Sequence, residues 1–257
     1  NSIQQTSDGG FIIAGESGPN DLNSDSWHEG YSDNRYVADY WIIKLDSLGE
    51  IEWQKCYGGS GRDFAKEIIQ TNDGGYIVAG TSWSNDGDIT SSKGNNDFWI
   101  VKLNNNGAIE WQKSYGGIGY EEANTIKQTV DGGYIIGGST SGSGYTGDVD
   151  CKLGSQDSWI LKINESGEIE WQKCLGNNLE QEAYSVYQTS DNGYIIATKS
   201  NFYSGYSGYN YWIFKLFSEQ MSNDETSNIN DFILYPNPAN NILNFSSKLK
   251  DIKVYNI

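Results

Sequence analysis

The sequence has little proline, cysteine, histidine or positive charge. Its 257 residues include 3 prolines, 3 cysteines and 1 histidine, and 17 lysines and arginines stand against 34 aspartates and glutamates. The net charge of −17 argues against nucleic acid or an anionic membrane surface as a partner, because too few cations are present to neutralise phosphates. No segment approaches the roughly 18 apolar residues of a membrane span. The acidic balance instead suits an extracellular protein or one that meets cations.

The three cysteines, Cys56, Cys151 and Cys174, are an odd number and lack the spacing of metal ligands. Cys56 and Cys174 stand at the same position in two copies of an internal repeat, where a third copy has Ser114. Such an interchange indicates a small side chain on a strand and not a disulfide. We therefore expect three unpaired thiols.

The chain is instead rich in aromatic residues (14%) and glycine (31 residues), and it contains an internal repeat. Near-copies of WIVKLNNNGAIEWQK begin at Trp41, Trp99 and Trp159, and WIFKLF begins a fourth at Trp212. The two tryptophans of each complete copy are 12 residues apart, and the second lies 20 residues before the aspartate of the next DGG or DNG turn. All length variation falls in the segment between that turn and the next WI tryptophan. A repeat architecture with insertions on one face has this pattern.

Each repeat reads as four short strands, typified by residues 67–71, 76–82, 97–103 and 108–115. Aspartate or asparagine followed by glycine marks tight hairpins between the first and second strands and between the third and fourth. The third strand is apolar on both faces, whereas the fourth is apolar on one face only. We therefore predict an all-β protein, a β-propeller of four-stranded antiparallel blades.

The predicted propeller covers residues 1–217, with blades at about 1–57, 58–115, 116–175 and 176–217. The last blade lacks an outer strand because no WQK segment follows its WI element. Because the chain opens on Asn1 within a first strand, we expect a fragment that forms an open arc or a ring lacking one strand. The repeated tryptophans are predicted to be core residues: Trp41, Trp53, Trp99, Trp111, Trp159, Trp171 and Trp212.

The repeat units resemble the roughly sixty-residue β-propeller repeats of secreted bacterial surface proteins over residues 1–217. The segment LDSLGEIEW is also similar to the tryptophan-docking turn of quinoprotein-type propellers, without its usual threonine. That turn is structural, so the likeness implies no quinone cofactor.

A polar linker, residues 218–231, leads to FILYPNPANNILNFSSKLKDIKVYNI at 232–257. The YPNPA element followed by an alternating strand and IKVYNI resembles the start of a type A C-terminal sorting domain of the type IX secretion system. The resemblance implies a small β-sandwich, here incomplete, that is recognised by the secretion machinery. It implies a protein that is secreted or held at the outer-membrane surface.

The variable segments carry aromatic residues among aspartate, asparagine, serine and glycine, a composition typical of glycan- or peptide-binding surfaces. We expect a ligand to contact these loops, first the insertion at 16–38. The candidate ligand-binding residues are Trp27, His28, Tyr31, Tyr36, Trp83, Tyr145 and Tyr206. An alternative is that these rings pack down on the rim of the blades.

Pairs of aspartates recur in two variable segments. Asp86 with Asp88, and Asp148 with Asp150, present oxygen ligands at alternate positions, which is compatible with Ca²⁺ but matches no EF-hand. We expect no other cofactor. Loop carboxylates also suit glycosidase chemistry. A Ser-His-Asp hydrolase would have to use His28, yet no GxSxG element accompanies it.

The sequence thus favours a non-enzymatic, monomeric binding scaffold for carbohydrate or protein. Enzymes gather unique residues in one pocket, whereas the distinctive residues here are spread over repeated copies. The alternatives are a propeller-type glycoside hydrolase or lyase that uses loop carboxylates, and a purely structural spacer.

Overall fold

The computed structural model describes residues 1–18, 38–141, 146–151, 154–176, 180–201 and 209–217. These ranges contain strands and turns but no helix, and hence no helix able to span a membrane. The strands are β1 (Ser2–Gln5), β2 (Phe11–Ser17), β3 (Asp39–Leu45), β4 (Ile51–Tyr57), β5 (Asp63–Gln70), β6 (Tyr76–Ser82), β7 (Asp97–Leu103), β8 (Ile109–Tyr115), β9 (Tyr120–Gln128), β10 (Tyr134–Ser141), β11 (Gln156–Ile163), β12 (Ile169–Leu175), β13 (Gln181–Gln188), β14 (Tyr194–Asn201) and β15 (Tyr209–Leu216).

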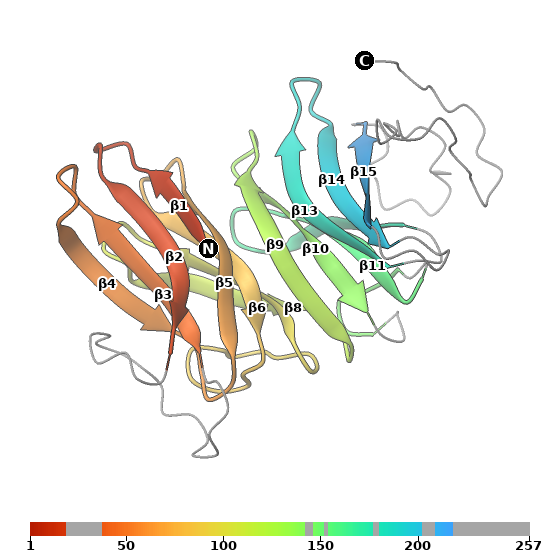
Figure 1. Cartoon of the computed structure of the whole chain (residues 1–257), viewed down its shortest axis with the longest axis horizontal. Coiled ribbons are helices and arrows are strands. Elements are labelled where there is room, and N and C mark those ends of the chain that lie inside the picture. The colour runs from red at the N-terminus through yellow and green to blue at the C-terminus, as the bar shows by residue number, and fades with distance from the viewer. Residues whose placement is uncertain (19–37, 142–145, 152–153, 177–179, 202–208, 218–257) are drawn as a thin grey trace.

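The strands form four antiparallel sheets in sequence order. Blades 1, 2 and 3 have four strands each (β1–β4, β5–β8 and β9–β12), and blade 4 has three, β13–β15, among the residues described. Neighbouring blades stack face to face, and blades 1 and 4 lie at opposite ends of the resulting arc (Figure 1). The predicted all-β fold with propeller-like blades is confirmed.

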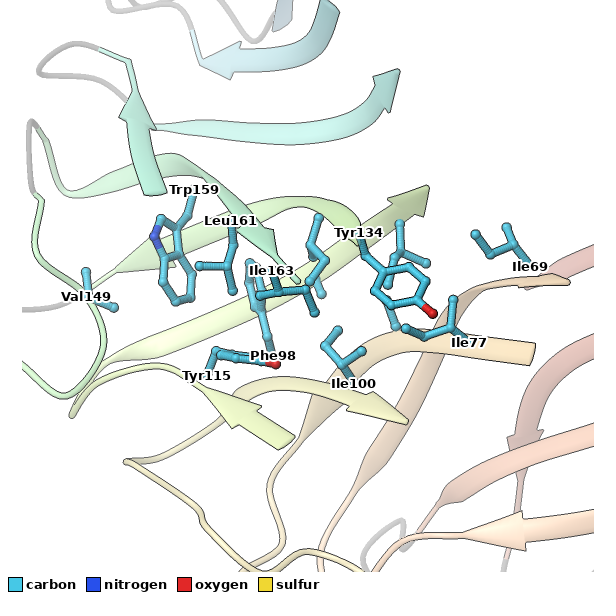
Figure 2. Packing of buried hydrophobic residues seen from close by; sticks show 14 of the residues in the cluster. Ile69, Ile77, Phe98, Ile100, Tyr115, Tyr134, Val149, Trp159, Leu161 and Ile163 are labelled. Atoms are coloured by element: carbon cyan, nitrogen blue, oxygen red, sulfur yellow. The ribbon is translucent and has the colours of Figure 1, made fainter. Parts of the chain in front are cut away.

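Repeated aromatic pairs hold the blades together. The fourth-strand tryptophan of one blade meets the first tyrosine of the next blade's second strand: Trp53–Tyr76, Trp111–Tyr134 and Trp171–Tyr194 have ring centroids 5.9, 6.3 and 5.5 Å apart. Figure 2 shows the core between blades 2 and 3, where Phe98 and Ile100 approach Trp159 and Leu161. Burial of such rings removes roughly 150–250 Å² each from water, so these contacts dominate blade packing.

The repeated tryptophans differ in exposure according to their blade. Trp99 and Trp159 are fully buried and Trp171 is 7% exposed. Trp53 and Trp111 are partly buried against the core between blades. Trp41 and Trp212 are also partly buried, Trp41 on the face of blade 1 turned away from blade 2.

A buried lysine links both hairpins in each of blades 1, 2 and 3. The Lys102 ammonium, in β7, lies 2.8 Å from the carboxylate of Asp73 in the first hairpin turn and 2.9 Å from that of Glu110 in β8. Lys44 and Lys162 make the same pairs, with Asp8 and Glu52 and with Asp131 and Glu170. In blade 4, Lys215 pairs with Asp191 at 2.6 Å. Paired in this way, an ammonium tolerates burial in the sheet.

The cysteine prediction is wrong for two of the three thiols. Cys151, in the loop between β10 and β11, forms a disulfide with Cys174 of β12, with Cα atoms 5.8 Å apart. Cys56 is buried and takes no part in a disulfide. The comparison of repeats predicted the position of Cys174 on its strand. It could not predict the partner, because Cys151 lies in a variable loop without counterpart in the other blades.

Candidate functional site

The variable loops and the connections between blades share one rim of the protein. In blade 2, the loop after β6 packs on the connection formed by residues 58–62. The backbone N–H of Trp83 donates to the Arg62 carbonyl at 2.9 Å, and that of Asp88 donates to the Gly58 carbonyl at 2.8 Å. In blade 3, the N–H of Asp148 donates to the Gly116 carbonyl at 2.7 Å. The base of these loops is thus fixed to the blade connections.

The first pair of candidate calcium ligands serves this anchoring. Asp86 accepts a hydrogen bond from the Ser60 N–H at 2.7 Å, and Asp88 accepts one from the Gly58 N–H at 3.1 Å. A methyl group on Gly59 would come within 2.6 Å of the Asp86 carboxylate, so the glycine permits this close approach. These carboxylates therefore bind backbone within their own blade.

The second pair is divided between two environments. Asp148 accepts a hydrogen bond from the Gly116 N–H at 3.3 Å and lies 3.8 Å from the Lys93 ammonium. Burial raises the pKa of Asp150, against the effect of Lys173. In the part of the chain that the structure describes, no three His, Cys, Asp or Glu side chains come together as a metal site.

Beneath the loops, each blade connection holds two buried polar side chains that the sequence analysis missed. One is the first or second residue of the third strand of a blade, and the other is the first or second residue of the first strand of the next blade. A methyl group on the intervening glycine would touch both. The three sets are Asp39 and Asp63 at Gly58, Asp97 and Glu121 at Gly116, and Asp157 and Gln181 at Gly176. All six side chains are at most 1% exposed. The signal was present in the sequence as the repeated DYW, DFW and DSW segments.

Glu121 is a buried carboxylate with a strongly raised pKa. Burial raises its pKa to about 7, and the negative charges of Asp97 and Asp148 act in the same direction. Its oxygens accept hydrogen bonds from the Gly117 N–H at 2.8 Å and the Thr140 hydroxyl at 2.9 Å. Burial likewise raises the pKa of Asp97 and of Asp63. A raised carboxyl pKa is common in active sites, but these groups lie beneath the surface and cannot contact a substrate without opening of the rim.

The described rim carries the exposed acid Asp86 and an exposed indole beside a partly buried guanidinium. Trp83 is 47% exposed, and the guanidinium carbon of Arg62 lies 5.6 Å from its ring centroid. Arg62 also lies over the ring of Phe64, at 4.6 Å, which holds the guanidinium beside the indole. Tyr120, which begins β9, is 54% exposed at the next connection. Six other candidate ligand-binding residues lie outside the described residues: Trp27, His28, Tyr31, Tyr36, Tyr145 and Tyr206.

Comparison with protein-family models and with curated proteins finds no match. Among solved structures, a mannose phosphorylase from Leishmania mexicana in complex with phosphate ion is similar, with 10% sequence identity and a TM-score of 0.45. The match covers 84% of this chain and 63% of that chain, less than two thirds of its length. Such a distant likeness carries no argument about the activity of the present protein.

Proposed function

We propose that the protein is a non-enzymatic binding scaffold, secreted or held at the outer-membrane surface, which takes a carbohydrate or protein ligand on its loop rim. The observation that carries the proposal is the exposed indole of Trp83 beside the Arg62 guanidinium. An indole face suits stacking against a sugar ring or an aromatic side chain, and the guanidinium beside it adds a positive charge to the surface. The backbone hydrogen bond between the two residues fixes this pair on the blade connection.

The contacts of the described carboxylates favour a binding role over the enzymatic alternative. A general acid must reach the atom to which it donates a proton. Glu121, whose pKa of about 7 would suit that task, is 1% exposed and hydrogen-bonded on both oxygens. Asp86, which is exposed, and Asp88, which is partly buried, each accept a hydrogen bond from a backbone N–H group. Glu121 thus supports the blade connection from below, and the two aspartates fasten the loop to that connection.

The disulfide supports an extracellular location. Disulfides persist in oxidising compartments and are rare in the cytosol of most organisms. Cys151–Cys174 agrees in this respect with the sorting-domain resemblance of residues 232–257, which lie outside the described residues. Fusion of residues 218–257 to a reporter, in a bacterium that has type IX secretion, should carry the reporter to the cell surface or medium. A reporter that stays in the periplasm would count against recognition by that machinery.

The binding proposal is tested by a screen of glycans and surface proteins with the full chain, followed by comparison of two variants. Trp83→Ala should reduce affinity for the ligand found by about tenfold or more, because an aromatic anchor is lost. Leu48→Ala is the matched control: Leu48 is 86% exposed in a hairpin turn, outside the rim segments, and its loss should leave affinity unchanged. Equal binding by the two variants would remove Trp83 from the site and with it the basis of the proposal.

A further inference from the structure

The contact between neighbouring blades has a repeated centre. In each blade, one residue of the third strand precedes the WI tryptophan and lies on the opposite face of the strand from it, the face turned away from the preceding blade; these residues are Tyr40, Phe98, Ser158 and Tyr211. The next blade places its own WI tryptophan opposite this residue. Beside that tryptophan lies the second-strand residue with which it pairs across the sheet. We call the first residue the knob and the cross-strand partner the socket.

The first two contacts pair an aromatic knob with a glycine socket. The Tyr40 hydroxyl donates to the Trp99 carbonyl at 2.9 Å, and the two rings lie 4.6 Å apart. A methyl group on the socket residue, Gly80, would lie 2.6 Å from that hydroxyl oxygen. Phe98 repeats the arrangement: its ring is 4.7 Å from Trp159, and its tip lies 2.7 Å from a methyl position on Gly138. Glycine is thus required wherever the knob is aromatic.

At the junction between blades 3 and 4 the two corresponding positions have the reverse sizes. Its knob is the small side chain of Ser158, and its socket is Thr198, which stands opposite Trp212 in the register of β14 and β15. Both residues are buried, at 0% and 1% exposure. Knob and socket sizes therefore vary together within this one chain, large with glycine and small with threonine, as close packing between blades demands.

Within the described residues, the two ends of the arc carry a knob and a socket of the aromatic–glycine kind that no neighbouring blade covers. Tyr211, the knob of blade 4, is 66% exposed. Gly15, the socket of blade 1, stands opposite Trp41 and has nothing within 4 Å of its methyl position. The ends lie apart in the structure, with blades 1 and 4 at opposite ends of the arc (Figure 1).

The faces around these two residues are the two halves of one blade contact. On blade 1, Phe11, Ile13 and Ile43 are partly exposed, whereas their counterparts in blade 2, Tyr76, Val78 and Val101, are at most 2% exposed. On blade 4, Ile195 and Ile213 are partly exposed, whereas their counterparts in blade 2, Ile77 and Ile100, are fully buried. Apolar faces of this kind are normally covered.

We infer that these end faces bind each other between two copies of the chain, with Tyr211 of one copy seated on Gly15 and Trp41 of the other. The interface joins unlike surfaces head to tail, so association closes a ring or continues as a filament, depending on the angle between copies. Tyr211 takes the place that Tyr40 has in the first contact, with its ring against Trp41. The association differs from the monomer that the sequence alone led us to expect.

The test is the molar mass of the full chain, measured by light scattering and sedimentation over a micromolar concentration range. The wild type should form species of two or more chains, each of 28.6 kDa. Tyr211→Ser and Gly15→Thr should each be monomeric, and both substitutions are compatible with a blade because Ser158 and Thr198 occupy the corresponding positions. Tyr120→Ser, which removes an exposed tyrosine outside the end faces, is the matched control and should associate as the wild type does.

An equal mixture of the two end-face variants gives the decisive result. The Tyr211→Ser chain keeps an intact socket and the Gly15→Thr chain keeps an intact knob, so the mixture should restore a species of two chains. Circular dichroism and thermal unfolding establish that each variant is folded. A wild type that stays monomeric throughout the range, or a mixture that does not associate although the wild type does, would overturn the inference.

Discussion

Asp97 and Glu121, which come from neighbouring blades, face the same point beside Gly116, where a methyl group would touch an oxygen of each carboxylate. Both side chains are 1% exposed, and Asp97 Oδ1 accepts no hydrogen bond. Two carboxylates so placed in a medium of low polarity disfavour simultaneous ionisation. This relationship makes the connection between blades 2 and 3 sensitive to pH.

Replacement of Glu121 by glutamine should remove that sensitivity. The pKa of Glu121 is raised to about 7 in the folded chain from a usual value of 4.5, so the folded state holds a proton that the unfolded state releases. Stability should therefore fall as pH rises from about 4.5 to 7, by up to roughly 3 kcal/mol, since one pKa unit corresponds to about 1.4 kcal/mol. Glu121→Gln should flatten this part of the profile and be more stable than the wild type at pH 8.

Gln181 is a natural precedent for this substitution, because it occupies the same position at the next connection. Denaturant unfolding between pH 4 and 9 measures the effect, with Glu122→Gln on the same strand as the control. If the free energy of unfolding depended on pH in the same way for the wild type and Glu121→Gln, the proton would not be held by Glu121.

Loss of the buried lysine should destabilise a blade. Lys102→Met leaves Asp73 and Glu110 without their shared ammonium, and we expect a loss of about 2 kcal/mol. This loss is smaller than that for breaking a fully buried ion pair, because both carboxylates are about half exposed and can be hydrated once the lysine is gone. Lys113→Met, at a lysine whose partner Glu168 is 72% exposed, should cost much less in the same denaturant titration.

Lys102 also affects how the stability of the protein depends on pH in acidic solution. Burial opposes ionisation of Asp73, but hydrogen bonds from Lys102 and Thr71 outweigh it and lower its pKa to about 2. The stabilisation is therefore complete above the usual pKa of 3.8 and is lost as pH falls toward 2. Lys102→Met should weaken this acid dependence. If the variant lost stability between about pH 4 and 2 as the wild type does, the ion pair between Asp73 and Lys102 would not contribute to stability.

Reduction of the disulfide should destabilise blade 3. Cys151 and Cys174 are separated by 23 residues, and closure of such a loop contributes roughly 3 kcal/mol. Thermal unfolding with and without a reductant should show this difference in the wild type and none in Cys151→Ser. Cys56→Ser is the matched control, because Ser114 occupies the same position in blade 2, and it should keep the full response to reductant. A wild type indifferent to reductant would argue that the bridge adds nothing to stability.

The sequence predicted the elements that recur in every copy and missed those that depend on how two blades meet. The tryptophan spacing and the glycine turns led to the strands and their order, because period-two patterns and positive-φ glycines act within one hairpin. The buried role of Asp39 and Asp97 was missed, since an acid at the start of a strand reads as a solvent-exposed end. Only the packing of the next blade's connection over these acids buries them.

The sequence led to the loop rim as the candidate site, and the binding role of that rim stays a prediction. The rim follows from the variable loop lengths, and Trp83 lies exposed on it. Asp86 and Asp88 are predicted cation ligands because alternate carboxylates are a local pattern, and this stays a prediction. Their hydrogen-bond partners, Ser60 and Gly58, come from a connection more than twenty residues away. Long-range backbone contacts of this kind have no sequence signature.

The most direct measurement of the binding role is a turnover assay on whatever glycan or protein the full chain binds. We predict saturable binding that is lost in Trp83→Ala, with the ligand recovered intact after prolonged incubation with the wild type. Multiple turnover of that ligand, abolished by replacement of a single rim acid such as Asp88, would contradict the account and identify the protein as an enzyme.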